Sequence, residues 1–216
     1  EALRCSGLAE TLLYDRVLGD PTLAPMRARQ AVAGLQVGEG GRTLRVEAYD
    51  KRYTDLAQLT RDNAVRAGGV GRARGVDAFL KGTLPGRVEA RTTYSLVRAE
   101  RTDPETGALA PAPFDVTHAL TTVVQRRLRG GLLLGATWRA ATGRPFTPVV
   151  GAEQDSAGAA WTPVYGLPNA ERFPAFRRLD LSASYTRPLG AGRLAVLYVS
   201  LNNALDRRNV QAWEYS

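Results

Sequence analysis

Hydrophobic and polar residues alternate along much of this chain. In the run 178–186 every second residue is apolar, and the residues between them are charged or carry hydroxyl groups. A second alternating run, 193–204, follows a connection that contains Gly190 and Gly192. Successive side chains of a β-strand point to opposite faces. The period of two therefore predicts two strands, the first with one apolar and one polar face.

The same period recurs from residue 29 to residue 204 and predicts eight strands. Their ranges are 29–37, 42–54, 71–84, 87–99, 116–128, 131–142, 175–188 and 193–204. Most of these strands hold roughly 9 to 14 residues, whereas strands of soluble sheets average about 5 to 6. A tilted strand needs about 9 to 11 residues to cross a bilayer. No run of about 18 to 20 apolar residues predicts a membrane-spanning helix.

Short and long connections alternate between these strands. The short ones are rich in glycine and lie at 38–41, 84–86, 129–130 and 189–192. The long ones cover 55–70, 100–115 and 143–174. In an antiparallel meander, alternate connections emerge at opposite ends of the sheet. Bacterial outer-membrane barrels show this asymmetry, with short periplasmic turns and long extracellular loops.

The two faces of the predicted sheet differ in chemistry. The apolar positions include Leu44, Val46, Val76, Leu80, Leu96, Leu120, Val124, Leu132, Leu134, Leu197, Val199 and Leu201. The polar positions include Arg45, Glu47, Lys51, Asp77, Lys81, Glu89, Arg91, Ser95, Arg139 and Asn202. A soluble barrel or sandwich buries its apolar face, and a membrane barrel turns that face to lipid. Strand length, loop asymmetry, and Tyr94, Trp138 and Tyr185 near strand ends favour an all-β, antiparallel up-and-down transmembrane β-barrel segment.

Composition excludes some function classes. The net charge of +8 comes almost wholly from arginine, since the chain has only two lysines, and it suits anionic partners such as lipopolysaccharide or an acidic solute. No nucleic-acid-binding signature accompanies it, so nucleic acid is not an expected partner. Cys5 is the only cysteine, which excludes an intrachain disulfide and a cysteine-based zinc site. We expect no cofactor and no metal.

Seven segments, in order along the chain, resemble one known family. They are 19–29, 45–56, 71–77, 94–96, 115–118, 138–148 and 201–206. The first segment departs from the family pattern, since Asp20, Ala24 and Met26 replace the usual Asn, Lys and Glu. The others include the aromatic strand around Tyr49 and Tyr53. The chain is identified on these segments as similar to the TonB-dependent receptors of bacterial outer membranes.

The resemblance implies that residues 1–216 are one part of a larger membrane receptor. It implies the C-terminal part of a twenty-two-stranded barrel, filled by an N-terminal plug domain and energised through the TonB complex. It also implies that the plug and the final strand lie outside this fragment. Such receptors import scarce solutes such as siderophore iron complexes, cobalamin or glycans, and none of them is an enzyme. The expected partners are outer-membrane lipid, lipopolysaccharide, the plug domain and the TonB complex.

Eight residues are candidates for solute binding, on three grounds. Arginines beside the glycine-rich stretch 68–75 have guanidinium groups that can capture a carboxylate or phosphate, although they can equally pair with lipopolysaccharide or neighbouring carboxylates. Tyrosines on the polar face of 42–54 can contact solute or plug. An aromatic residue in the longest connection can take part in recognition. The candidates are Arg45, Tyr49, Tyr53, Arg72, Arg74, Arg139, Arg144 and Trp161.

Two other functions stay open on the sequence. One is an autonomous eight-stranded outer-membrane barrel with a structural or adhesion role, which requires strand 29–37 to pair with strand 193–204. The other is a barrel hydrolase that depends on His118, the only histidine. The chain has no nucleophile elbow of the form Gly-x-Ser-x-Gly. The favoured interpretation of His118 is therefore structural, at the point where a loop enters a strand.

Overall fold

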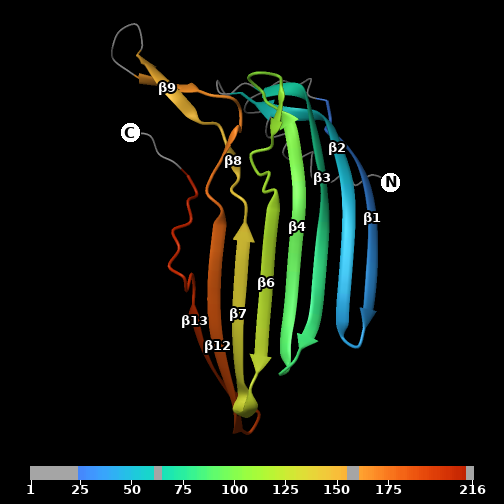
Figure 1. The fold of residues 1–216 in the computed structure, drawn as a ribbon, viewed down its shortest axis with the longest axis vertical. Helices are drawn as coiled ribbons and strands as arrows, with labels where there is room; N and C mark the ends of the chain where they lie inside the picture. The colour runs from blue at the N-terminus through green and yellow to red at the C-terminus, as the bar shows by residue number, and fades with distance from the viewer. Residues whose placement is uncertain (1–23, 61–64, 155–160, 213–216) are drawn as a thin grey trace.

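One antiparallel sheet dominates the molecule (Figure 1). The computed structural model describes residues 24–60, 65–154 and 161–212. Eight strands follow one another in chain order, each hydrogen-bonded to the next, and a short strand β5 (Leu109–Pro111) pairs with β4. The eight are β1 (Arg27–Glu39), β2 (Arg42–Leu59), β3 (Val65–Leu84), β4 (Val88–Thr102), β6 (His118–Arg127), β7 (Leu132–Ala141), β12 (Phe176–Gly190) and β13 (Arg193–Leu201). All eight predicted strands are confirmed.

The connections divide between the two ends of the sheet as predicted. The turns β1–β2, β3–β4, β6–β7 and β12–β13 lie at the lower end in Figure 1, and the long connections lie at the upper end. The β1–β2 turn needs glycine, because Gly40 and Gly41 both have positive φ, of 57° and 80°. The only helical segment in the described residues is the single turn η1 (Arg129–Gly131). No described helix has the length and hydropathy of a membrane span.

Strand register separates the two faces cleanly. Leu44 of β2 lies opposite Val37 and Leu80, and farther along the sheet Thr122 lies opposite Trp138. We call this side the apolar face; in β2 it carries the even-numbered residues from Arg42 to Arg52. The polar face carries the residues between them. One row across it joins Arg45, Phe79, Thr93, Thr121, Arg139 and Arg178.

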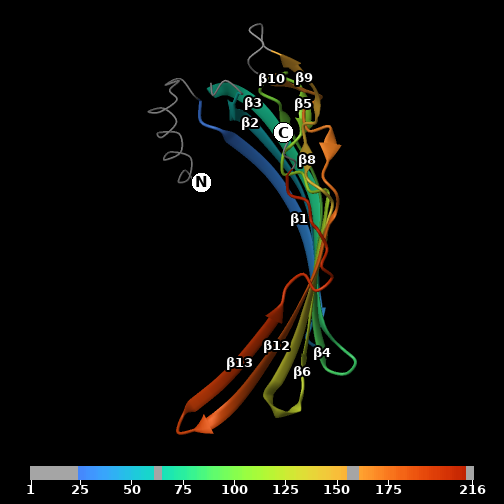
Figure 2. The same cartoon turned by 90° about the vertical axis from the view of Figure 1, so that its left-hand side faces the viewer.

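The sheet is a single curved layer without a packed core of its own (Figure 2). Ala110 is the one buried hydrophobic residue among those described, and Leu35, Leu80 and Val199 are all more than half exposed. Within the described ranges, no second layer covers the apolar face as it does in a soluble sandwich. β1 and β13 are the two edges of the sheet and do not pair. The closure that an autonomous eight-stranded barrel requires is therefore not formed.

Two of the predicted long connections are more regular than expected. The prediction of a loop at 55–70 is wrong, because β2 continues to Leu59 and β3 begins at Val65. An alternating pattern is hidden there by a bulge, where the register shifts between Tyr53 and Leu56 and Asp55 takes a φ of +57°. The connection 143–174, predicted only as a long loop, contains two small sheets, β8 (Pro145–Phe146) with β11 (Glu171–Arg172) and β9 (Val149–Gln154) with β10 (Trp161–Tyr165).

Candidate functional site

The polar face carries a cluster of charges around Asp180 of β12. Arg139 donates from Nη1 to Oδ2 of Asp180 at 2.7 Å, and Arg178 donates from Nε to Oδ1 at 2.6 Å. The backbone N–H of Asn203 also donates to Oδ1, at 2.9 Å. Only 15% of the Asp180 side chain is exposed. The register places Arg139 beside Arg178 across the strand pair, so one carboxylate serves both guanidinium groups.

Arg45 and Tyr49 lie on the same polar face, on β2. Arg45 pairs with Glu47 at 2.9 Å, and both side chains are substantially exposed. Tyr49 lies opposite Gly75 of β3, and a Cβ added to Gly75 would come within 2.6 Å of the tyrosine hydroxyl. Nζ of Lys51 lies over the Tyr49 ring, 4.9 Å from its centroid, in a cation–π contact. Tyr49 is thus held over a glycine, a packing role that the sequence did not predict.

Tyr53 continues this line of polar-face residues toward the long-loop end of β2. Its register partner on β3 is Gly71, whose hypothetical Cβ would lie 3.7 Å from Cβ of Tyr53. The bulge that begins after Tyr53 ends the regular pairing of the two strands. Arg45, Tyr49, Tyr53 and Arg139 therefore share one face, as the alternation predicts.

Arg72 and Arg74 lie on the opposite side of the sheet from these four residues. They follow the alternation of Val76 and Leu80, so they extend the apolar face toward the long loops. Arg72 binds Asp50 through Nε and Nη2, both at 2.9 Å, and Arg52 also contacts Asp50, at 3.2 Å. The structure thus divides the predicted candidates between two faces that a ligand cannot bridge.

Arg144 and Trp161 belong to the long connection between β7 and β12. Arg144 donates to the backbone oxygen of Gln211 and lies over the Phe173 ring, 5.3 Å from its centroid. It therefore ties the connection to the segment after β13. Trp161 begins β10, pairs with Gln154 in register and is 68% exposed. Its indole is the more available of the two groups for recognition.

An ion pair that the sequence did not predict joins two of the long connections. Asp115, only 2% exposed, accepts the backbone N–H of Ala99 at 2.8 Å on Oδ1, and its Oδ2 accepts from Arg172. Arg172 also donates from Nη1 to two backbone oxygens, that of Asp115 at 2.6 Å and that of Gly143 at 3.1 Å. Asp115 lies in one of the family-like segments, but its partner is 57 residues away, a distance that no local pattern reveals.

His118 is placed at the start of β6, on the apolar face. Its Nδ1 lies 2.8 Å from the hydroxyl of Tyr94. Both carboxylate oxygens of nearby Asp115 are occupied, by Ala99 and Arg172. His118 and Asp115 therefore do not form the base and orienting acid of a hydrolytic triad. No cluster of three metal-ligating acids, cysteines or histidines occurs in the ranges that the structure describes.

Comparison with known families decides the class of the chain. The family described as "TonB dependent receptor-like, beta-barrel" matches residues 7–204. This chain belongs to that family. The resemblance seen in the sequence is confirmed, and so is the fold class. No curated protein sequence matches the chain.

Solved structures agree with this TonB-dependent receptor barrel in fold. The ferric-catecholate import receptor Fiu from E. coli K12 is 16% identical over 89% of this chain, with a TM-score of 0.60. The FrpB iron transporter from Neisseria meningitidis is 17% identical over 86%, with a TM-score of 0.59, and the outer membrane transporter YddB from Escherichia coli is 12% identical over 87%, with a TM-score of 0.62. The chain spans 25%, 28% and 30% of those three proteins.

Proposed function

We propose that this chain forms part of a receptor in the bacterial outer membrane that takes up a scarce solute with energy from the TonB complex. The observation that supports this most is the bare apolar face of a single-layer sheet. Without a second layer of protein, that face is compatible with water only at a large cost in hydrophobic free energy. Lipid removes that cost, so we infer that the apolar face meets the membrane.

Arginines border the apolar face at both ends and support this orientation. Near the long loops they are Arg29, Arg52, Arg72, Arg74 and Arg98, and near the short turns they are Arg42, Arg126, Arg187 and Arg193. Long basic side chains at the edges of an apolar band keep their charge at the water interface. We assign the long loops to the outside and the short turns to the periplasm, as in other barrels of this type.

The polar face would line the lumen of the barrel. The apolar residues on this face of β13 support a protein domain inside the lumen. Leu194, Val196 and Tyr198 occupy polar-face positions of β13 and are 59%, 60% and 63% exposed. Apolar residues on both faces of a strand are typical of burial on both faces. We propose that lipid covers one face of β13 and the receptor's plug domain covers the other.

An anionic ferric siderophore complex is our preferred solute. Two of the similar structures are described as a ferric-catecholate import receptor and an iron transporter. Arg45 and Arg139 on the polar face carry the guanidinium groups suited to an anionic complex, and the exposed indole of Trp161 is suited to first contact. Tyr49 and Tyr53 share that face. Cobalamin and glycans are the alternative cargoes.

Lipopolysaccharide is the proposed partner of the arginines near the long loops. Asp50 and Glu100 neutralise part of that group, through Arg52, Arg72 and Arg98. Arg74 takes part in no ion pair among the described residues, so its guanidinium is open to a phosphate.

Uptake by the full-length receptor tests the proposal. The receptor would be expressed in a strain that lacks its own ferric-catecholate receptors, and uptake of radioactive iron as the catecholate complex would be measured. We expect uptake that requires the TonB complex, and a KM raised on the order of tenfold by R45Q or R139Q. R72Q, on the opposite face, is the matched control and should leave KM unchanged. Uptake that persists without the TonB complex would disprove the proposed mechanism, and uptake of cobalamin or a glycan alone would reassign the solute.

A further inference from the structure

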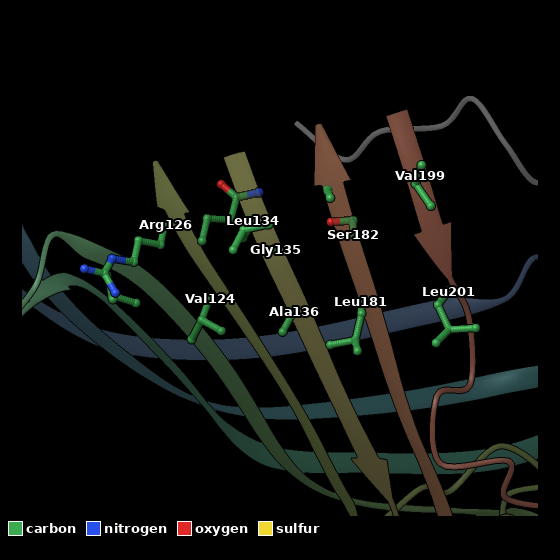
Figure 3. A pocket seen from close by; sticks show the side chains of 12 residues that line it. Val124, Arg126, Leu134, Gly135, Ala136, Leu181, Ser182, Val199 and Leu201 are labelled. Carbon is green, nitrogen blue, oxygen red and sulfur yellow. The ribbon is translucent and has the colours of Figure 1, made fainter. Parts of the chain in front are cut away.

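A shallow hollow of about 610 Å³ lies on the apolar face, across β6, β7, β12 and β13 (Figure 3). Small side chains make it, since Ala136 lies opposite Leu181 and Ala183 lies opposite Leu134 and Val199. The larger residues stand around the alanines, so the sheet is indented between them. The volume is within the range of about 300 to 1,000 Å³ that is typical of small-molecule sites.

Arg126 is the one charged residue that lines this hollow, whose lining is otherwise apolar except for Gln125 and Ser182. Arg126 lies near the short-turn end of β6, opposite Val88 of β4 and Leu134 of β7, which places it on the apolar face. Its guanidinium lies beside the β3–β4 turn, where a Cβ on Gly86 would be 3.8 Å from Nη2. In the described parts of the chain, no ion pair involves Arg126.

The two edges of the apolar face thus differ in their electrostatics. Near the long loops, Asp50 and Glu100 pair with Arg52, Arg72 and Arg98, whereas Arg74 has no ion pair among the described residues. Near the short turns, the hollow ends at an arginine whose charge the described protein leaves uncompensated. A charge at the boundary of an apolar surface is favourable when an anion from the surroundings pairs with it.

We propose that the hollow binds an acyl chain of an anionic glycerophospholipid whose phosphate pairs with Arg126. The proposal rests on the orientation given above, in which the short turns face the periplasm and the apolar face meets lipid. Guanidinium groups bind phosphate oxygens in a bidentate manner, and an acyl chain that starts at this level extends along the apolar face. Arg187 and Arg193, at the same end of β12 and β13, add to the positive potential there.

Native mass spectrometry of the full-length receptor in detergent tests this site. The probes are phosphatidylglycerol and phosphatidylethanolamine with identical acyl chains. We expect the receptor to retain phosphatidylglycerol in preference, and R126Q to reduce its retention about fivefold. R42Q is the matched control, since Arg42 lies on the same face and edge but away from the hollow. A136L fills the hollow and should reduce retention of phosphatidylglycerol as well.

Several results would overturn the proposal. They are equal retention of the two lipids, equal losses in R126Q and R42Q, or full retention in A136L. Failure of this site is distinguishable from failure of the proposed function, because iron uptake by the wild type reports on the latter. R126Q should retain wild-type uptake, since Arg126 lies on the face away from the lumen.

Discussion

Arg172 of β11 holds the buried carboxylate of Asp115 and so joins the connection before β6 to the connection before β12. Asp115 is 2% exposed, and its remaining oxygen accepts from the backbone of Ala99. The pair is therefore a fixed point between two long loops whose other parts are more exposed. If these loops bind solute as proposed, recognition would depend on this ion pair, because binding loops need a defined position.

Loss of Arg172 should loosen both loops. R172A leaves the Asp115 carboxylate buried without its cation, which we expect to cost about 3 kcal/mol. The expected result is faster protease cleavage within 143–175 and a lower midpoint of urea unfolding. R98A is the control, since Arg98 forms an exposed pair with Glu100 and its loss should cost less than about 1 kcal/mol. Equal protease resistance of R172A and wild type would contradict the prediction.

Adjacent residues on β7 should lose different amounts of stability when a charge is introduced. Ala136 lies on the apolar face and Thr137 on the polar face. If the apolar face meets lipid as proposed, A136R places a guanidinium against lipid and should destabilise the receptor by about 2 to 4 kcal/mol, whereas T137R would enter the lumen and should cost less than about 1 kcal/mol. Urea unfolding in lipid vesicles measures both. The reverse order of the two losses would show that the apolar face is not the lipid face.

Gly75 should not tolerate a methyl group. A Cβ at this position would lie 2.5 Å from the backbone oxygen of Leu96 and 2.6 Å from the hydroxyl of Tyr49. We expect G75A to cost on the order of 1 to 3 kcal/mol, because backbone and ring must both shift. G151A is the matched control, since the nearest atom to a Cβ there is 3.9 Å away. Thermal unfolding compares the two variants, and equal midpoints would show that the strands adjust without strain.

Asp180 should be the most sensitive charge of the polar face. It accepts from Arg139, Arg178 and the backbone of Asn203, so D180N leaves two guanidinium groups without their anion. We expect a clear loss in the free energy of unfolding, because one change removes three hydrogen bonds to a charged acceptor. E47Q removes the anion of a single exposed pair and should change stability by less than about 1 kcal/mol. If the two losses were the same, the shared carboxylate would have no special role.

Periodicity predicted the sheet well and the site only in part. The alternation of Leu44, Val46 and Ala48 with Arg45 and Glu47 is a local signal, so both the strands and their faces could be read from it. The bulge after Tyr53 interrupts that signal, and the extension of β2 was missed for this reason.

The candidate site was predicted less well than the sheet. Arg72 and Arg74 were grouped with Arg45 as solute ligands, although the parity of their positions places them on the other face. Both residues lie in the predicted strand 71–84, and the alternation with Val76 and Leu80 in that strand already separates them from Arg45. The pairing of Asp115 with Arg172 depends on how two connections fold over the sheet, which alternation within a strand does not determine.

The chain-order sheet has a mechanical consequence. Each strand is hydrogen-bonded only to the strands before and after it, so stability spreads along one dimension, as it does in repeat proteins. Disruption of β6 would leave β1 to β4 and β7 to β13 as two separate ladders. Two contacts join the connection before β6 to the connection before β12, the ion pair of Asp115 with Arg172 and the hydrogen bond from Nδ2 of Asn169 to the backbone oxygen of Pro111. They would hold the two ladders together independently of the strand pairing.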